Sequence, residues 1–165
     1  MSIDSIQLTS VLVEKLYNKH LYNFNTAGHN TSKEKNDGFK SLGNNEKNIL
    51  IIVNEPHALH VQEDDLKLLT GILSACKLSV ADVALVNTDK NTFANFSTLN
   101  ETFNPAIVLL FGVTPDALDF PMEFPLFQLQ QYNRQKYLSS PSLSEISIDK
   151  SLKKNLWDIL QKIFN

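Results

Sequence analysis

Three short apolar runs constrain the fold of this chain most strongly: residues 49–53 (ILIIV), 83–87 (VALVN) and 106–112 (AIVLLFG). Each is rich in aliphatic and β-branched side chains, which is typical of strands covered on both faces. Between the first two runs, residues 62–78 repeat apolar side chains at helical spacing, with a stripe of Leu66, Leu69, Leu73 and Cys76. Strands that alternate with helices predict a mainly parallel sheet wrapped on both faces.

The C-terminal part of the chain completes this pattern. Residues 124–140 predict a fourth strand region, with a hairpin turning at Tyr132 and Asn133. Residues 149–164 predict a final helix, which carries the only tryptophan. We therefore expect residues 48–165 to form an α/β domain with three layers, α/β/α, around a mainly parallel central sheet of about four strands.

The N-terminal part of the chain has a different character. Residues 1–24 predict an amphipathic helix, because apolar side chains recur at helical spacing over more than one stripe. Residues 25–47 are polar and predict a flexible linker, since they bury too little apolar surface to offset the entropy of ordering. The helix either docks on a partner or covers the sheet. The candidate partner-binding residues are Leu8, Leu12, Leu16, Tyr17 and, in the last helix, Trp157.

Charge and cysteine content narrow the classes of function. The net charge is −3 and the only arginine is Arg134, which argues against strong direct binding to nucleic acid. Cys76 is the only cysteine, so the cysteines alone cannot form a disulfide, a zinc cluster or an iron–sulfur site. The first residues lack a signal-peptide pattern, and no apolar run approaches a membrane span. We expect a cytoplasmic protein without membrane contact, metal or cofactor.

Ligand sites in open α/β sheets form at the carboxyl ends of the strands. There, the loop NEPHALH holds Glu55, a candidate general base, and His57 and His60 at H-x-x-H spacing. A metal site needs at least a third ligand, so solvated loop histidines are favoured. The serines of SSPSL are explained by capping and turn formation. We therefore predict no catalytic residues; if the chain were an enzyme, the candidates would be Glu55, His57 and Ser140.

Three stretches together resemble the uracil-DNA glycosylase superfamily over residues 48–164. They are ILIIVNEPHALHVQEDDLKLLTGILSACKLSVADVALVNTDK, AIVLLFGVTPDAL and SSPSLSEISIDKSLKKNLWDIL, in the order of that family's motifs. The resemblance implies a glycosylase-like fold. Asn54 and His57 stand in a loop that is glycine-rich in the enzymes, and Ser140 stands where the family has the histidine that stabilises the leaving uracil anion. The resemblance therefore implies a degenerate active site.

The outline of the chain is also similar to the psi-subunit family of the bacterial DNA polymerase III holoenzyme, a non-enzymatic branch of this fold. The stretches that carry this similarity are VNEPHAL, SPSL and NLWDIL. What the resemblance implies is an adaptor that links a clamp loader subunit to a chi-like subunit or a single-strand-binding-protein partner. Two alternatives stay open: an active uracil-DNA glycosylase-type base-excision enzyme, and an unrelated protein-binding module on the same fold.

If the N-terminal helix docks on a partner, replacing Leu12 and Leu16 with glutamine should weaken binding to that partner at least about a hundredfold. Each leucine buried at an interface contributes roughly 1.5–3 kcal/mol. Affinity for a purified clamp loader and thermal stability should be measured together. A large fall in melting temperature would show instead that the helix covers the sheet.

Overall fold

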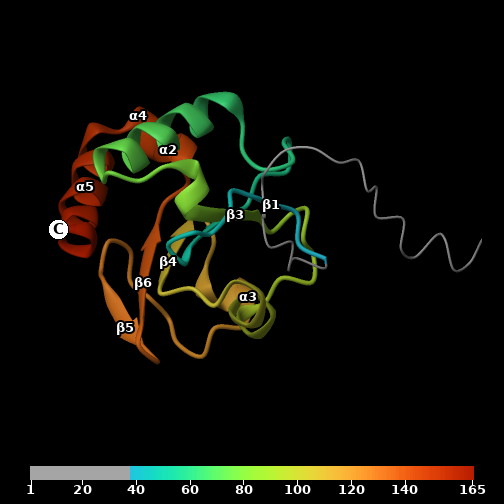
Figure 1. Cartoon of the computed structure of the whole chain (residues 1–165). Coiled ribbons are helices and arrows are strands. Elements are labelled where there is room, and N and C mark those ends of the chain that lie inside the picture. Colours follow the sequence, from blue (N-terminus) through green and yellow to red (C-terminus); the bar gives the residue numbers. More distant parts are fainter. Residues whose placement is uncertain (1–37) are drawn as a thin grey trace, which may run out of the picture. The chain divides into compact units, whose positions relative to one another are not determined.

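The computed structural model describes residues 38–165. Its central feature is a six-stranded sheet in the order β1-β3-β2-β4-β6-β5 (Figure 1). The inner strands β3, β2, β4 and β6 pair in parallel, whereas β1 and β5 pair antiparallel with their neighbours at the two edges. The strands are β1 (Ser41–Leu42), β2 (Ile49–Val53), β3 (Val83–Asn87), β4 (Ile107–Phe111), β5 (Gln130–Tyr132) and β6 (Gln135–Ser140).

The α/β class predicted from the sequence is confirmed, and the prediction of parallel pairing holds for the inner four strands. The edge strands make the sheet mixed, and they bring it to six strands where the sequence predicted about four. Strand β5 is antiparallel because the two residues Asn133 and Arg134 join it to β6, and such a short connection allows only a hairpin. Both residues have positive φ, as a type I′ turn requires, so the turn lies one residue later than predicted.

Helices cover both faces of the sheet (Figure 1). In the described part of the chain they are α2 (Glu63–Ala75), α3 (Phe96–Phe103), α4 (Leu143–Ile148) and α5 (Lys150–Phe164). Short 3₁₀ segments span Val80–Asp82 and Pro115–Leu118. None of the helices in residues 38–165 combines the length and apolar character that crossing a membrane would require.

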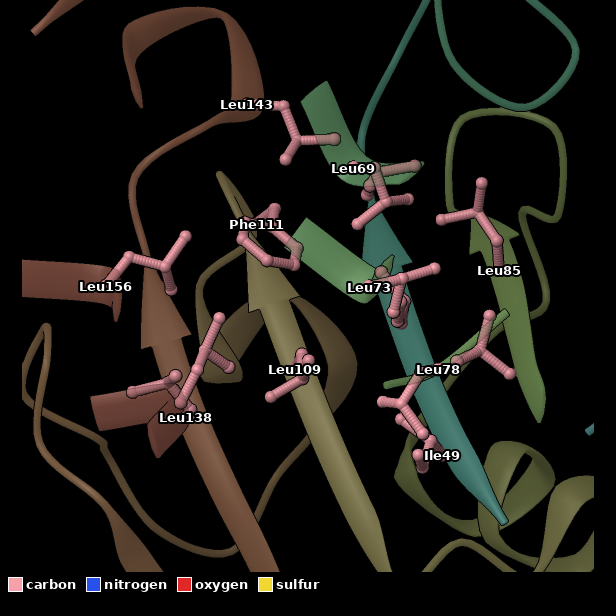
Figure 2. Packing of buried hydrophobic residues seen from close by; sticks show 14 of the residues in the cluster. Ile49, Leu69, Leu73, Leu78, Leu85, Leu109, Phe111, Leu138, Leu143 and Leu156 are labelled. Carbon is pink, nitrogen blue, oxygen red and sulfur yellow. The ribbon is translucent and has the colours of Figure 1, made fainter. Parts of the chain in front are cut away.

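Strand β2 alternates its side chains between two apolar clusters. Ile49, Ile51 and Val53 face the cluster that α2, α4 and α5 complete, whereas Leu50 and Ile52 face the cluster that α3 completes. In Figure 2, Leu69 and Leu73 of α2 lie over β2, between Leu85 of β3 and Leu109 of β4, and Leu156 of α5 lies over β6. The strand is therefore apolar throughout because neither of its faces meets solvent.

Residues 38–47 correct the predicted linker boundary, because this segment belongs to the folded domain. Ser41 and Leu42 pair with β3, and Phe39 is only 8% exposed. The ring of Phe39 packs against those of Phe93 and Phe103, with centroids 4.6 and 5.4 Å apart. Backbone pairing and one anchored aromatic ring order a segment whose composition is otherwise polar. The rest of the predicted linker, residues 25–37, and the predicted helix 1–24 lie outside the described residues.

A buried amide also fastens this segment. Asn91 is 1% exposed, and its side chain accepts a hydrogen bond from the backbone N–H of Lys40 (2.8 Å) and donates one to the carbonyl of Lys40 (3.1 Å). The Asn91 amide thereby makes the two hydrogen bonds to Lys40 that the backbone of a paired strand would make. The backbone N–H groups of residues 44–47 donate to the carbonyls of residues 81–83.

Substituting Gly43 tests whether this segment contributes to stability. Its φ is +99°, and an added Cβ would collide with the backbone carbonyls of Val80 and Val83. We expect Gly43→Ala to lower the free energy of unfolding by about 1–3 kcal/mol or more in urea denaturation. Gly71→Ala is the matched control: it lies in α2, nothing meets its Cβ position, and it should raise stability by roughly 0.5–1 kcal/mol. Equal stability of the two variants would contradict the role of residues 38–47.

Candidate functional site

A polar pocket of about 230 Å³ lies where the strand order reverses. The chain runs from β2 through α2 to β3 on one side, then through α3 to β4 on the other side of β2. Such a reversal opens a crevice at the carboxyl ends of the strands. The polar side chains that line it are amides and hydroxyls, so the lining offers hydrogen bonds but no acid or base: Asn54, Thr88, Asn91, Thr92 and Thr114.

Asn87 holds the loop that follows β2. Its side chain is fully buried at the end of β3. The amide oxygen accepts from the N–H groups of Glu55 (2.9 Å) and Asp89 (3.1 Å), and the amide nitrogen donates to the carbonyls of Glu55 (2.7 Å), Ala58 (3.0 Å) and Leu59 (3.3 Å). Five hydrogen bonds thus converge on one side chain and fix the path of the loop.

The side chain of Glu55 and the backbone of His57 help to fix the path of this loop. One carboxylate oxygen of Glu55 accepts from the backbone N–H of His57 (2.9 Å), and the other accepts from the side chain of Gln62 (3.3 Å). His57 is exposed, and neither residue lines the polar pocket. His60 is half-buried, burial lowers its pKa, and its Nδ1 atom has no hydrogen-bond partner.

Ser140 lies at the end of β6 and is 2% exposed. Its hydroxyl donates to the carbonyl of Pro141 (3.2 Å), and no hydrogen bond joins it to Glu55 or His57. Ser142 is the N-cap of α4. Its hydroxyl and its backbone N–H both donate to the carboxylate of Glu145, and these two hydrogen bonds lower the pKa of the Glu145 carboxyl. Ser140 therefore shares no hydrogen bond with the other two enzyme candidates. Within residues 38–165, acidic, histidine and cysteine side chains nowhere gather into a group of three suited to a metal ion.

A second hollow is apolar and larger, about 400 Å³, and lies between α2 and α5. We call it the α2–α5 groove. Trp157 is half-buried and forms part of its lining, so this predicted partner-binding residue lies in an apolar groove. The other predicted partner-binding residues, Leu8, Leu12, Leu16 and Tyr17, lie outside the described residues. The apolar side chains that line the groove are Leu68, Ile72, Ala75, Ile146, Leu156, Trp157 and Leu160.

Gly71 keeps the groove open. It lies in the interior of α2, it lines the groove, and a Cβ atom built there would meet nothing within 4 Å. Glycine inside a helix lowers stability relative to alanine by roughly 0.5–1 kcal/mol. Neither a positive φ nor close packing requires glycine here. The missing side chain therefore adds space to the groove at a small cost in stability.

Two lysines border the groove with different electrostatic surroundings. Lys67 pairs with Glu63 (3.0 Å) and Asp64 (3.7 Å), one turn earlier on α2. Lys153 is exposed on α5 and forms no ion pair with any residue from 38 to 165. The α5 side of the groove therefore presents a lysine that is not in contact with a carboxylate of the described residues.

The chain matches no protein-family model, and none of the curated proteins matches it either. The assignment of a role therefore depends on the geometry of the polar pocket and the groove.

The structural role of Asn87 was not predicted from the sequence, because an asparagine after an apolar run is a common way for a strand to end. We expect Asn87→Ala to lower the free energy of unfolding by about 2–4 kcal/mol, since it removes five partly buried hydrogen bonds and leaves the backbone groups of the loop without these partners. Urea denaturation measures this change, and faster proteolysis within residues 54–61 should accompany it. Asn54→Ala, at an exposed position beside it, is the control. A loss below about 0.5 kcal/mol for Asn87→Ala would contradict its role.

Proposed function

We propose that this protein is a non-catalytic adaptor of the bacterial replisome, similar to the psi subunit and with a degenerate uracil-DNA glycosylase-like fold. In this role it is cytoplasmic and joins a clamp loader subunit to a chi-like subunit or a single-strand-binding-protein partner. The observation that carries the proposal is the α2–α5 groove, an apolar hollow on the surface of the domain with Trp157 in its lining.

The groove supports a role in protein binding for two physical reasons. Contiguous apolar surface that is open to solvent on a folded domain marks an interaction site, because burial of that surface stabilises a complex. Tryptophan is also enriched among the residues that dominate binding energy at protein interfaces. Both features coincide on α5, the helix whose sequence NLWDIL contributed to the resemblance to the psi-subunit family.

The carboxyl ends of the strands support a non-catalytic role. Glu55 holds a loop turn, and Ser140 is buried with its hydroxyl on the next carbonyl. A general base must reach the proton that it abstracts, and a nucleophile must reach its substrate. The buried Ser140 hydroxyl does not meet this requirement in the described arrangement.

One observation favours the second candidate, a DNA base-excision enzyme. The polar pocket at the strand reversal is large enough for a small planar ligand and is lined by amides and hydroxyls that could hydrogen-bond it. In that case Glu55 or His57 would have to take over the charge-stabilising role of the missing histidine.

Binding measurements separate the two candidates. Full-length protein should bind a purified clamp loader and a chi-type subunit, and Trp157→Ala should weaken one of these complexes at least about tenfold, since buried tryptophans dominate interface energies. Tyr132→Ala is the matched control, because Tyr132 is a 40% exposed aromatic residue on β5, away from the groove. Calorimetry gives the affinities, and thermal melting checks that both variants stay folded.

The same preparation should release no uracil above background from single-stranded DNA. Uracil release that Glu55→Ala or His57→Ala abolishes would establish the enzyme instead. Absence of binding to both replisome partners would remove the adaptor role.

A further inference from the structure

We propose that the α2–α5 groove binds one amphipathic helix of a partner, whose apolar face fills the hollow and whose flanks carry Asp or Glu. This inference rests on the proposed function and names the chemistry of the partner. It follows from the shape of the groove, from its charge and from the side chains that the domain itself exposes.

The shape fits a helix. Two helices, α2 and α5, provide the walls, and Ile146 of α4 contributes to the apolar lining. Helices pack by placing the side-chain ridges of one into the grooves of another, and a pair of neighbouring helices offers such a groove to a third. At Gly71 the wall lacks a side chain, so a large apolar side chain of the incoming helix can enter there without displacing any atom within 4 Å of the Cβ position.

The charge selects an acidic helix. Lys153, which lines the groove, and Lys154, which does not, precede Trp157 by four and three residues on α5, and residues at this spacing are neighbours on a helix surface. One exposed carboxylate, Asp158, follows Trp157 on the same helix, so the two lysines outnumber it. Neither lysine forms an ion pair within the described chain. Carboxylates on the flank of the bound helix would meet these charges, whereas a basic flank would be repelled.

A second copy of the folded domain fits the groove less well. To fill it, the copy would need an apolar ridge on a helix surface. Among the large apolar side chains exposed in residues 38–165, only Ile148 belongs to a helix, and it stands at the end of α4. The others lie in loops and on the short edge strand: Leu59, Phe93, Leu126, Leu129 and Tyr132. The chain's own predicted helix, residues 1–24, lacks the acidic character that the lysines favour, because its two acidic residues are balanced by two lysines. We therefore infer a helix of a partner as the occupant.

The test titrates the full chain with a synthetic peptide helix of about 18 residues, roughly five turns, with leucines at i, i+3 or i+4, and i+7 and with glutamates on both flanks. The peptide contains no tryptophan. Trp157 is the only tryptophan of the protein, so its emission reports occupation of the groove, and calorimetry measures the affinity independently. The emission should shift to shorter wavelength as leucines exclude water from the ring. A matched peptide with lysines in place of the glutamates should bind at least about tenfold more weakly.

Variants locate the binding site. Gly71→Leu fills the hollow and should weaken binding of the acidic peptide at least about tenfold, because the incoming side chain loses its space. Gly71→Ala should change the affinity less than about threefold, since one methyl group leaves most of the hollow open. Thr70→Leu adds the same side chain to α2 at an exposed position that does not line the groove, and binding should be unchanged. Lys153→Glu should weaken binding of the acidic peptide and strengthen binding of the lysine peptide.

Three results would overturn the inference: equal affinity for both peptides, no binding of either, or binding that Gly71→Leu leaves intact. Self-association in sedimentation that Gly71→Leu abolishes would identify a second copy as the occupant and would also overturn it.

Failure of the adaptor role is a separate result. If the acidic peptide binds as described but no clamp loader or chi-type subunit binds, the groove chemistry holds and the replisome assignment fails. If those subunits bind equally well to Gly71→Leu, the adaptor uses another surface, and the groove is not the site of the adaptor role.

Discussion

Burial of β2 on both faces and along both edges is the constraint on which the rest of the domain depends. Every residue of this strand is buried, and it pairs in parallel with β3 on one side and β4 on the other. Each buried aliphatic side chain contributes about 1.5–3 kcal/mol, so the strand must be covered by apolar helices above and below. Parallel pairing in turn places the carboxyl ends of the inner strands, and therefore their loops, at one edge of the sheet.

The two hollows follow from this arrangement in different ways. The polar pocket is a consequence of strand order, because the chain leaves β2 and β4 toward opposite sides. The groove is a consequence of helix packing, because α2 and α5 cover the same face and Gly71 leaves a gap between them. The buried amides of Asn87 and Asn91 contribute stability rather than chemistry, since their hydrogen bonds all go to the backbone.

The inner strands and the main helices could be predicted from sequence. A strand buried on both faces is a short continuous apolar run, and a helix with one buried face repeats apolar residues at helical spacing. The stretch 38–47 could not, because its order comes from backbone pairing with β3 and from the contacts of Phe39, which composition does not reveal. Trp157 was identifiable as a candidate from its type alone. The groove beside it was not, since it depends on Gly71, which lies far away in sequence and looks like an ordinary weak point in a helix.

The brevity of the edge strands has a consequence for how this protein associates. Strand β1 pairs through two residues and β5 through three, and β5 covers the first half of β6, Gln135–Tyr137. An exposed edge is a template for adding strands from other molecules, and short edges offer few free backbone groups for that purpose. The parallel core is therefore shielded from strand addition and the aggregation that follows from it. If the protein is an adaptor as we propose, its assembly would use the helical face that holds the α2–α5 groove.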